Sequence, residues 1–229
     1  MEDDFKNIVS TDWLAQHLEA PDIRIIDSSW YFPQEKRNAE QEFLECHIPG
    51  ASFFDIDKIK DNESHLPHML PPSAMFNSTV RKLGIGDGHK VVIYDGLGMR
   101  SAARLWWMFK VFGYSDVVVL DGGFPKWVKE NRSTTADITE KEIRHLTIYE
   151  DKSIVADRDD VLRATKLNHC SIIDARSEGR FMGTAPEPRS GLRSGSIENS
   201  INVPYETLLN EDFTFKSKRE IIDLSLIHI

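Results

Sequence analysis

The chain has 229 residues, with 28 Lys or Arg against 37 Asp or Glu, so its formal net charge is −9. This acidic balance argues against nucleic acid as a main partner, because a phosphate backbone attracts basic surfaces. No apolar run approaches the roughly 18 residues that cross a bilayer, so no membrane partner is expected. Two cysteines, Cys46 and Cys170, are too few for a disulfide framework or a four-thiolate zinc site. The acidic start resembles neither a signal peptide nor an Arg-rich transit peptide, so we expect a cytoplasmic protein, with mitochondria as the alternative compartment.

The first half of the chain alternates helix and strand patterns. A short helix is expected over Asp12–His17, capped by Ser10 or Thr11. Runs rich in β-branched residues predict three buried strands, at Ile23–Asp27, Val91–Tyr94 and Val117–Leu120. Because these strands lack internal polar alternation and are separated by helices, they indicate a parallel sheet covered on both faces. The predicted fold class is α/β.

A longer helix is expected between the second and third strands, from about Ser101 to Phe112, with Gly113 as its stop. Its expected buried side chains are large and apolar: Leu105, Trp106, Met108, Phe109 and Phe112. The loop before it, residues 95–100, follows the second strand and contains two glycines.

The second half of the chain repeats the order of the first. Val155–Asp157 opens a helix to about Thr165, and Ser171–Asp174 reads as a strand. Val9–Asp27 has the same order of cap, helix and strand earlier in the chain. The offset is about 147 positions. Residues 131–152 are polar and read as a linker. We therefore predict an N-terminal domain at 1–135, a linker at 136–152 and a second domain of the same kind at 153–229.

The second copy is shorter than the first. Only 55 residues follow Asp174, and no counterpart of Val91–Trp127 is among them. The expectation from this comparison is that the printed residues stop within the second domain.

Several motifs resemble the tandem-domain rhodanese family, and within it the mercaptopyruvate sulfurtransferases. They are His47–Ala51, the strand and loop around Tyr94–Gly96, Arg104–Phe109, and Asp121–Phe124 followed by Trp127. The likeness runs from about Val9 to Leu209. It implies two rhodanese-like domains, the first non-catalytic and the second catalytic.

The resemblance implies a persulfide relay, in which a cysteine thiolate takes sulfur from 3-mercaptopyruvate or thiosulfate and passes it to a thiol or to cyanide. Such a thiolate needs a loop of backbone N–H groups at a helix N-terminus to stabilise it. In the first copy that slot holds Asp95, which cannot carry sulfur. Neither Cys46 nor Cys170 opens a glycine-bearing loop before a helix, so both are expected to pack in the core. The nucleophile is then missing from these residues, and the printed chain is expected to be inactive.

Other family positions are present. By resemblance, Arg180 and Arg189 bind the α-keto acid of the substrate, with Glu187 orienting one of them, since guanidinium forks suit a carboxylate. The alternative is that these are solvated loop arginines in weak surface ion pairs. The resemblance also implies a proton relay. In this relay Asp57 orients His68, and His68 assists a loop serine in proton transfer. For His68, a solvated loop histidine is the alternative.

The leading hypothesis is thus a sulfurtransferase that needs no cofactor and no metal, with a small-molecule sulfur donor and a thiol acceptor such as thioredoxin or a small thiol. The alternative hypothesis is a catalytically silent rhodanese-like binding or regulatory module, which draws on Asp95 in the first slot.

Overall fold

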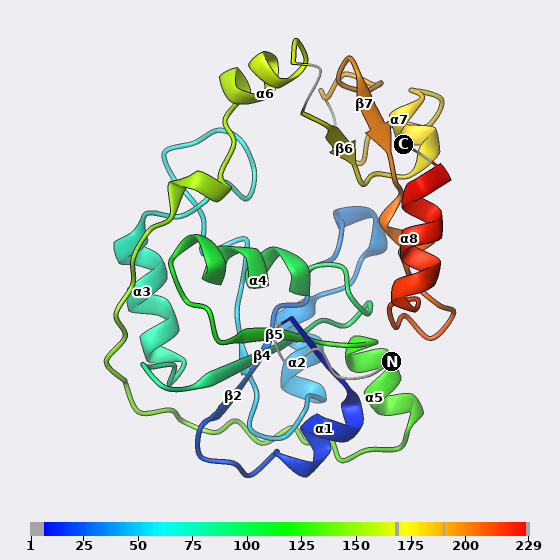
Figure 1. Cartoon of the computed structure of the whole chain (residues 1–229). Helices are drawn as coiled ribbons and strands as arrows, with labels where there is room; N and C mark the ends of the chain where they lie inside the picture. The colour runs from blue at the N-terminus through cyan, green and yellow to red at the C-terminus, as the bar shows by residue number, and fades with distance from the viewer. Residues whose placement is uncertain (1–6, 168–169, 190, 228–229) are drawn as a thin grey trace. The chain divides into compact units, whose positions relative to one another are not determined.

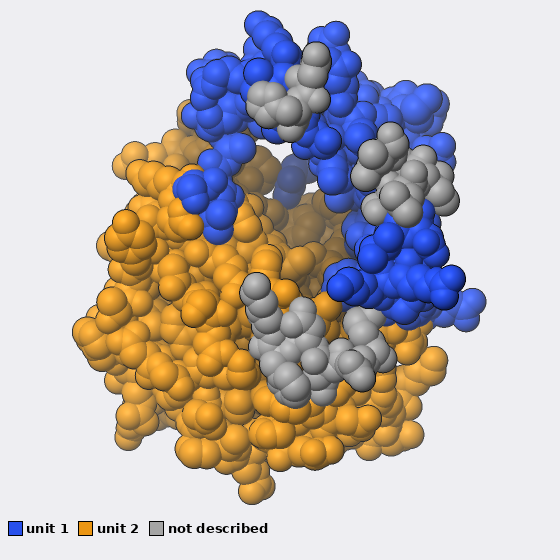
Figure 2. All heavy atoms as spheres, viewed as in Figure 1, with its two compact units in different colours: residues 1, 153–211, 215–229 blue, residues 2–152, 212–214 orange. Residues whose placement is uncertain are grey.

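A computed structural model of the chain describes residues 7–167, 170–189 and 191–227 (Figure 1). The chain folds into two compact units, coloured orange and blue in Figure 2. The N-terminal unit holds Glu2–Lys152 together with Asp212–Thr214, and the C-terminal unit holds Ser153–Glu211 and Phe215–Ile229. Each unit is described by itself below.

The N-terminal unit is built on a five-stranded parallel sheet in the order β1-β5-β4-β2-β3. The strands are β1 (Ile8–Val9), β2 (Ile23–Asp27), β3 (Ser52–Phe53), β4 (Lys90–Tyr94) and β5 (Val117–Leu120). The central pair is in register from Ile23 opposite Lys90 to Asp27 opposite Tyr94. The carboxyl ends of β2 and β4 therefore meet at one edge of the sheet.

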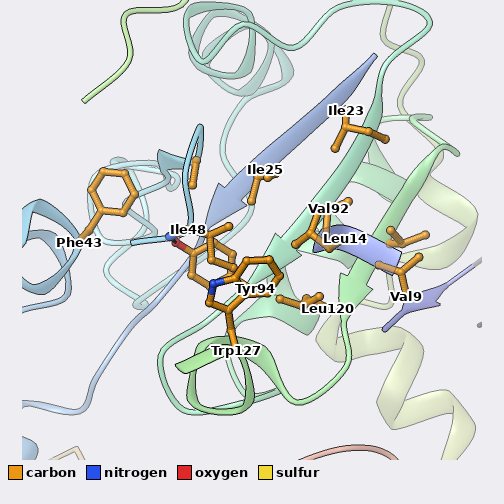
Figure 3. Close-up of a cluster of buried hydrophobic side chains, with 12 residues drawn as sticks. Val9, Leu14, Ile23, Ile25, Phe43, Ile48, Val92, Tyr94, Leu120 and Trp127 are labelled. Carbon is orange, nitrogen blue, oxygen red and sulfur yellow. Dashed lines mark hydrogen bonds between the residues drawn. The ribbon is translucent and has the colours of Figure 1, made fainter. Parts of the chain in front are cut away.

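Helices cover both faces of this sheet (Figure 1). On one face lie α1 (Thr11–Gln16), α2 (Ala39–Glu45) and α5 (Gly123–Lys129), and on the other α3 (Ser73–Lys82) and α4 (Ala102–Val111). Alternate side chains of each strand enter the two resulting cores, as the pleat requires. Figure 3 shows the first core, in which Ile25, Val92 and Leu120 of the sheet meet Leu14 of α1 and the fully buried Trp127 of α5.

The predicted elements of this unit are confirmed. Strands β2 and β5 have the expected bounds, and Ser10 caps α1 by accepting a hydrogen bond from the Trp13 amide at 3.1 Å. The expectation that Trp106 is buried is wrong. Its ring is half-buried because its indole N–H reaches the Val117 carbonyl at 3.1 Å, at the margin of the sheet, and the Lys110 ammonium lies over it.

Residues 131–152 have no helix or strand except at the very end, but they follow the surface of the N-terminal unit. The Asp87 amide donates to the His145 carbonyl at 3.0 Å, and the Tyr149 amide donates to Phe112 at 3.1 Å. Leu146 is only 3 % exposed. These contacts assign the polar segment to the N-terminal unit up to Lys152.

The C-terminal unit contains a parallel pair of strands, β6 (Ile172–Asp174) and β7 (Ser200–Asn202). Its helices are α6 (Arg158–Ala164), α7 (Glu178–Phe181) and α8 (Lys218–Ile227). As predicted, α6 begins after Asp157, whose side chain accepts from the Asp160 amide in a capping box. None of the helices in the described part of the chain is long and apolar enough to cross a bilayer.

The two units repeat one local structure. In the N-terminal unit Asp27 pairs with Phe53, its carbonyl accepts from the Phe54 amide at 2.8 Å, and its carboxylate accepts from the Ser29 amide at 2.8 Å. In the C-terminal unit Asp174 pairs with Asn202 and makes both bonds, with the amides of Val203 and Arg176, each at 2.9 Å. The agreement supports the duplication that the sequence indicated.

The second core of the N-terminal unit centres on Phe76 of α3. This ring is fully buried, stacks on Phe112 at 4.4 Å between centroids and meets Phe109 edge-on at 5.1 Å. We expect Phe76→Ala to lower the free energy of unfolding by about 3–5 kcal/mol, because it loses this burial and leaves a cavity. Urea unfolding measures it. Leu44→Ala, at a 47 % exposed position on α2, is the control and should cost less than about 0.5 kcal/mol; similar losses for both would contradict this core.

Candidate functional site

The loop between β4 and α4 folds around the carboxylate of Asp95. This carboxylate is buried, and three backbone amides point at it: Leu97 donates to Oδ1 at 2.9 Å, and Arg100 and Ala102 donate to Oδ2 at 2.7 and 2.8 Å. Converging amides ahead of a helix form an anion site. In the N-terminal unit this site is therefore occupied by the protein's own side chain.

A second carboxyl group, Asp27, lies beside this loop at the end of β2. It accepts from the backbone and hydroxyl of Ser29, and the same hydroxyl accepts from the Gly96 amide at 2.8 Å. Burial raises the pKa of Asp27 to about 7, although the hydrogen bonds from Ser29 and Tyr94 oppose this and the nearby Asp95 adds to it. Asp27, Ser29, Gly96 and Cys46 help line a pocket of about 230 Å³. Arg37 and Glu42, which form an ion pair at 2.6 Å, also line this pocket.

The structure brings Asp57 and His68 together, as predicted. His68 Nε2 lies 2.6 Å from Asp57 Oδ1, and the Trp30 indole donates to Asp57 Oδ2 at 2.9 Å. Burial raises the pKa of Asp57, but the hydrogen bonds from His68 and Trp30 outweigh it and leave this pKa below its usual value. The His68 side chain is 16 % exposed, and the Asp57 side chain with which it pairs is 59 % exposed. Trp30 is a partner that the sequence analysis did not single out.

In the C-terminal unit, Glu187 joins two arginines. Its Oε2 accepts from Arg180 Nη2 at 2.6 Å and from Nε at 3.1 Å, and its Oε1 accepts from Arg176 Nη1 at 2.9 Å. The Glu187 side chain is 4 % exposed, and the hydrogen bond from Arg180 is the main cause that lowers its pKa. The Arg180 side chain of this pair is 26 % exposed, so water is excluded mainly from the Glu187 carboxylate. Sequence reasoning missed Arg176, although it occupies the repeat position of Ser29, 147 residues later.

Arg189 lies two residues after Glu187 in the same loop and is half-buried. The expectation that Arg180 and Arg189 converge on one ligand stays a prediction. Arg180 uses Nε and Nη2 for Glu187, and among the described residues no acceptor engages its Nη1. Within the described ranges, one edge of this guanidinium is therefore left for a ligand.

The cysteines differ from the expectation of two core-packing thiols. Cys46 is half-buried at the C-terminal end of α2, where a helix presents carbonyl oxygens, and Cys170 is exposed just before β6. The expectation is wrong for Cys170, because the two-stranded sheet beside it has an uncovered face, as the 65 % exposure of Ile173 shows. Neither thiol lies in a loop of converging amides, as Asp95 does.

Known proteins resemble this chain over most of its length. A model of the rhodanese-like domain matches residues 10–130. The 3-mercaptopyruvate sulfurtransferase of Rattus norvegicus is 40 % identical over 95 % of this chain and 75 % of its own length. The thiosulfate sulfurtransferase of Bos taurus is 41 % identical over the same shares. The crystal structure of SseA from Escherichia coli, described as a 3-mercaptopyruvate sulfotransferase with the rhodanese fold, matches with a TM-score of 0.87 and 36 % identity, over 96 % of this chain and 83 % of that one. The chain therefore belongs to the rhodanese family of sulfurtransferases.

Proposed function

We propose that the protein moves sulfur from 3-mercaptopyruvate to a thiol or to cyanide, and that this sulfur is carried as the outer atom of a cysteine persulfide. Its relatives include enzymes named for mercaptopyruvate and for thiosulfate at nearly the same identity, so overall similarity does not choose the donor. The observation that favours mercaptopyruvate as the donor is the contact between Arg180 and Glu187. Arg180 uses Nε and Nη2 for this contact, and among the described residues its Nη1 edge has no acceptor. That edge, with Arg189, suits the planar carboxylate and keto oxygens of an α-keto acid.

Bracing by Glu187 matters for binding because a long arginine side chain loses rotamer freedom when it captures a ligand. Glu187 already fixes Arg180 through two hydrogen bonds, and Arg176 fixes Glu187 from the other side. Arg176 in turn donates from Nε to both Asp174 oxygens at 3.0 Å, at the end of β6. The Arg180 guanidinium is thus connected to the end of β6 through Glu187 and Arg176 before a substrate binds.

In the proposed transfer a cysteine thiolate attacks the donor sulfur, the S–S bond forms, and the C–S bond of mercaptopyruvate breaks. The electron pair leaves on the enolate of pyruvate, which takes up one proton. Asp57 would hold His68 in one orientation, and His68 would move protons through a serine of the active-site loop. The 2.6 Å contact between Asp57 and His68 supports this assignment.

The carrier thiol in this proposal is neither Cys46 nor Cys170. A thiolate is stabilised by converging amides at a helix N-terminus. Cys46 lies instead at a helix C-terminus and Cys170 before a strand. We therefore expect the 229 printed residues, by themselves, to transfer no sulfur.

The acceptor in this proposal is thioredoxin or a small thiol. The proposed compartment is the reducing cytoplasm, because a persulfide relay needs free thiols. The alternative proposal, a silent binding or regulatory module, is favoured by one observation: Asp95 fills the anion site of the N-terminal unit with a group that cannot carry sulfur. The pyruvate titration below distinguishes the two, because a silent module has no site for an α-keto acid.

Substrate binding is tested with pyruvate, which shares the α-keto carboxylate and does not react. We expect Arg180→Met to weaken pyruvate binding by at least about tenfold, since hydrogen bonds to a charged group contribute about 1.5–3 kcal/mol. Isothermal titration of this chain measures the affinity. Arg163→Met is the matched control, because Arg163 is an exposed arginine of α6 paired with Asp160. Equal pyruvate affinity in the wild type and Arg180→Met would remove Arg180 from the site.

The carrier is tested with mercaptopyruvate and cyanide. We expect the 229-residue chain to form no thiocyanate above the blank, and the masses of its Cys46 and Cys170 peptides to gain no sulfur, while the Rattus norvegicus relative assayed in parallel turns over. Turnover that persists in the double variant Cys46→Ser/Cys170→Ser would contradict a persulfide mechanism. A sulfur adduct on either thiol during turnover would contradict the assignment of the carrier.

A further inference from the structure

The loop that carries His68 has a backbone that needs support. His68 adopts φ +57°, in the left-handed region, within a stretch that has no helix or strand. A non-glycine residue in that region costs roughly 1–2 kcal/mol relative to an ordinary conformation. The side chain nevertheless reaches Asp57 at 2.6 Å and meets the Trp30 ring edge-on at 4.9 Å. Some other contact must therefore hold the backbone of this residue in place.

Arg104 provides that contact from α4. Its Nη2 donates to the backbone carbonyl of His68 at 2.5 Å. The helix that carries Arg104 is well anchored, because its neighbours Leu105, Met108 and Phe109 are at most 1 % exposed. Helix α4 thus holds the main chain of His68 through a hydrogen bond, while the imidazole makes its own contacts with Asp57 and Trp30.

The remaining contacts of Arg104 do not explain why a half-buried position on this helix holds a guanidinium. The group lies over the Trp107 ring at 4.6 Å, its Nε is buried without a partner, and among the described residues it forms no ion pair. Burial lowers its pKa, so ionisation is opposed at this position. Within the part of the chain that the structure describes, the one hydrogen bond from the Arg104 side chain is that to the His68 carbonyl.

We propose that Arg104 is a positioning residue, which fixes the main chain of His68 so that the imidazole lies against Asp57 and Trp30. This role rests on the proposed function of the Asp57–His68 pair, which it deepens. Arg104 itself touches no reacting atom. Its effect passes through the carbonyl of His68 to the orientation of the ring.

The test reads the Asp57 carboxyl group by carbon NMR in the full 229-residue chain. Asp57 is surrounded by His68, Trp30 and the more distant Lys60, and of these only the first two donate hydrogen bonds to it. We expect Arg104→Met to raise the pKa of Asp57 by about half a unit or more, toward the ordinary value of about 3.9. His68→Gln gives the size of the full effect. A second readout at neutral pH is the nuclear Overhauser contact between the rings of His68 and Trp30, which should weaken in Arg104→Met.

The matched control is Lys110→Met. Lys110 is a cation on the same helix that also lies over a tryptophan ring, at 5.4 Å, and donates to a backbone carbonyl, that of Ser115 at 2.6 Å. Lys110→Met should leave the pKa of Asp57 at its wild-type value. Arg104→Lys, which keeps a donor, should retain most of the wild-type titration. If Arg104→Met does not fold, Arg104→Gln takes its place, because its amide is too short to reach the carbonyl.

Two outcomes overturn the proposal and differ from each other. If His68→Gln raises the pKa of Asp57 while Arg104→Met changes neither readout, the pair exists and Arg104 does not position it. If His68→Gln leaves Asp57 unchanged, the pair itself is absent, and the proton-relay part of the proposed function fails along with the role of Arg104.

Discussion

The interaction on which the rest of this structure depends is the convergence of three backbone amides on one carboxylate after a parallel strand. Leu97, Arg100 and Ala102 can all donate to Asp95 because β4 ends there and α4 begins within a few residues. The same geometry would stabilise a thiolate or a persulfide as well as a carboxylate. The N-terminal unit therefore has an anion-binding loop that holds the oxygen atoms of its own carboxylate. This occupation supports the proposal that the first domain does not carry the sulfur.

The repeated turn after β2 and β6 shows how one scaffold can serve different ends. The Asp at each strand end makes the same two backbone contacts, but two residues later the N-terminal unit has Ser29 and the C-terminal unit has Arg176. Ser29 ties the turn to the Gly96 amide, whereas Arg176 ties it to Glu187 and through it to Arg180. The residue two positions after the aspartate thus contacts the loop after β4 in the N-terminal unit and Glu187, the partner of Arg180, in the C-terminal unit.

The sequence predicts the parts of this protein in which local pattern and burial agree. Strands such as Val117–Leu120 are uniform apolar runs, so their bounds could be placed correctly. The two-residue strands β1 and β3 were not predicted, because two residues carry no periodicity. Family motifs led to Asp57, His68, Arg180 and Glu187, but their partners Trp30 and Arg176 lie outside those motifs. Arg104 lies within a family motif, yet its contact with the His68 carbonyl emerges only when the loops are folded. The half-exposure of Trp106 and the exposure of Cys170 depend on what lies next to them in space.

The most direct test of the account is to place a thiol in the amide loop of the N-terminal unit. In a Cys46→Ser/Cys170→Ser background, Asp95→Cys has a single thiol, whose ionisation can be followed by the ultraviolet absorbance of the thiolate. If the three amides form an anion site, this thiol should titrate with a pKa below about 7, well under the ordinary value of about 8.5. A pKa at or above that ordinary value in the folded protein would contradict the claim that this loop is built to hold a negative charge.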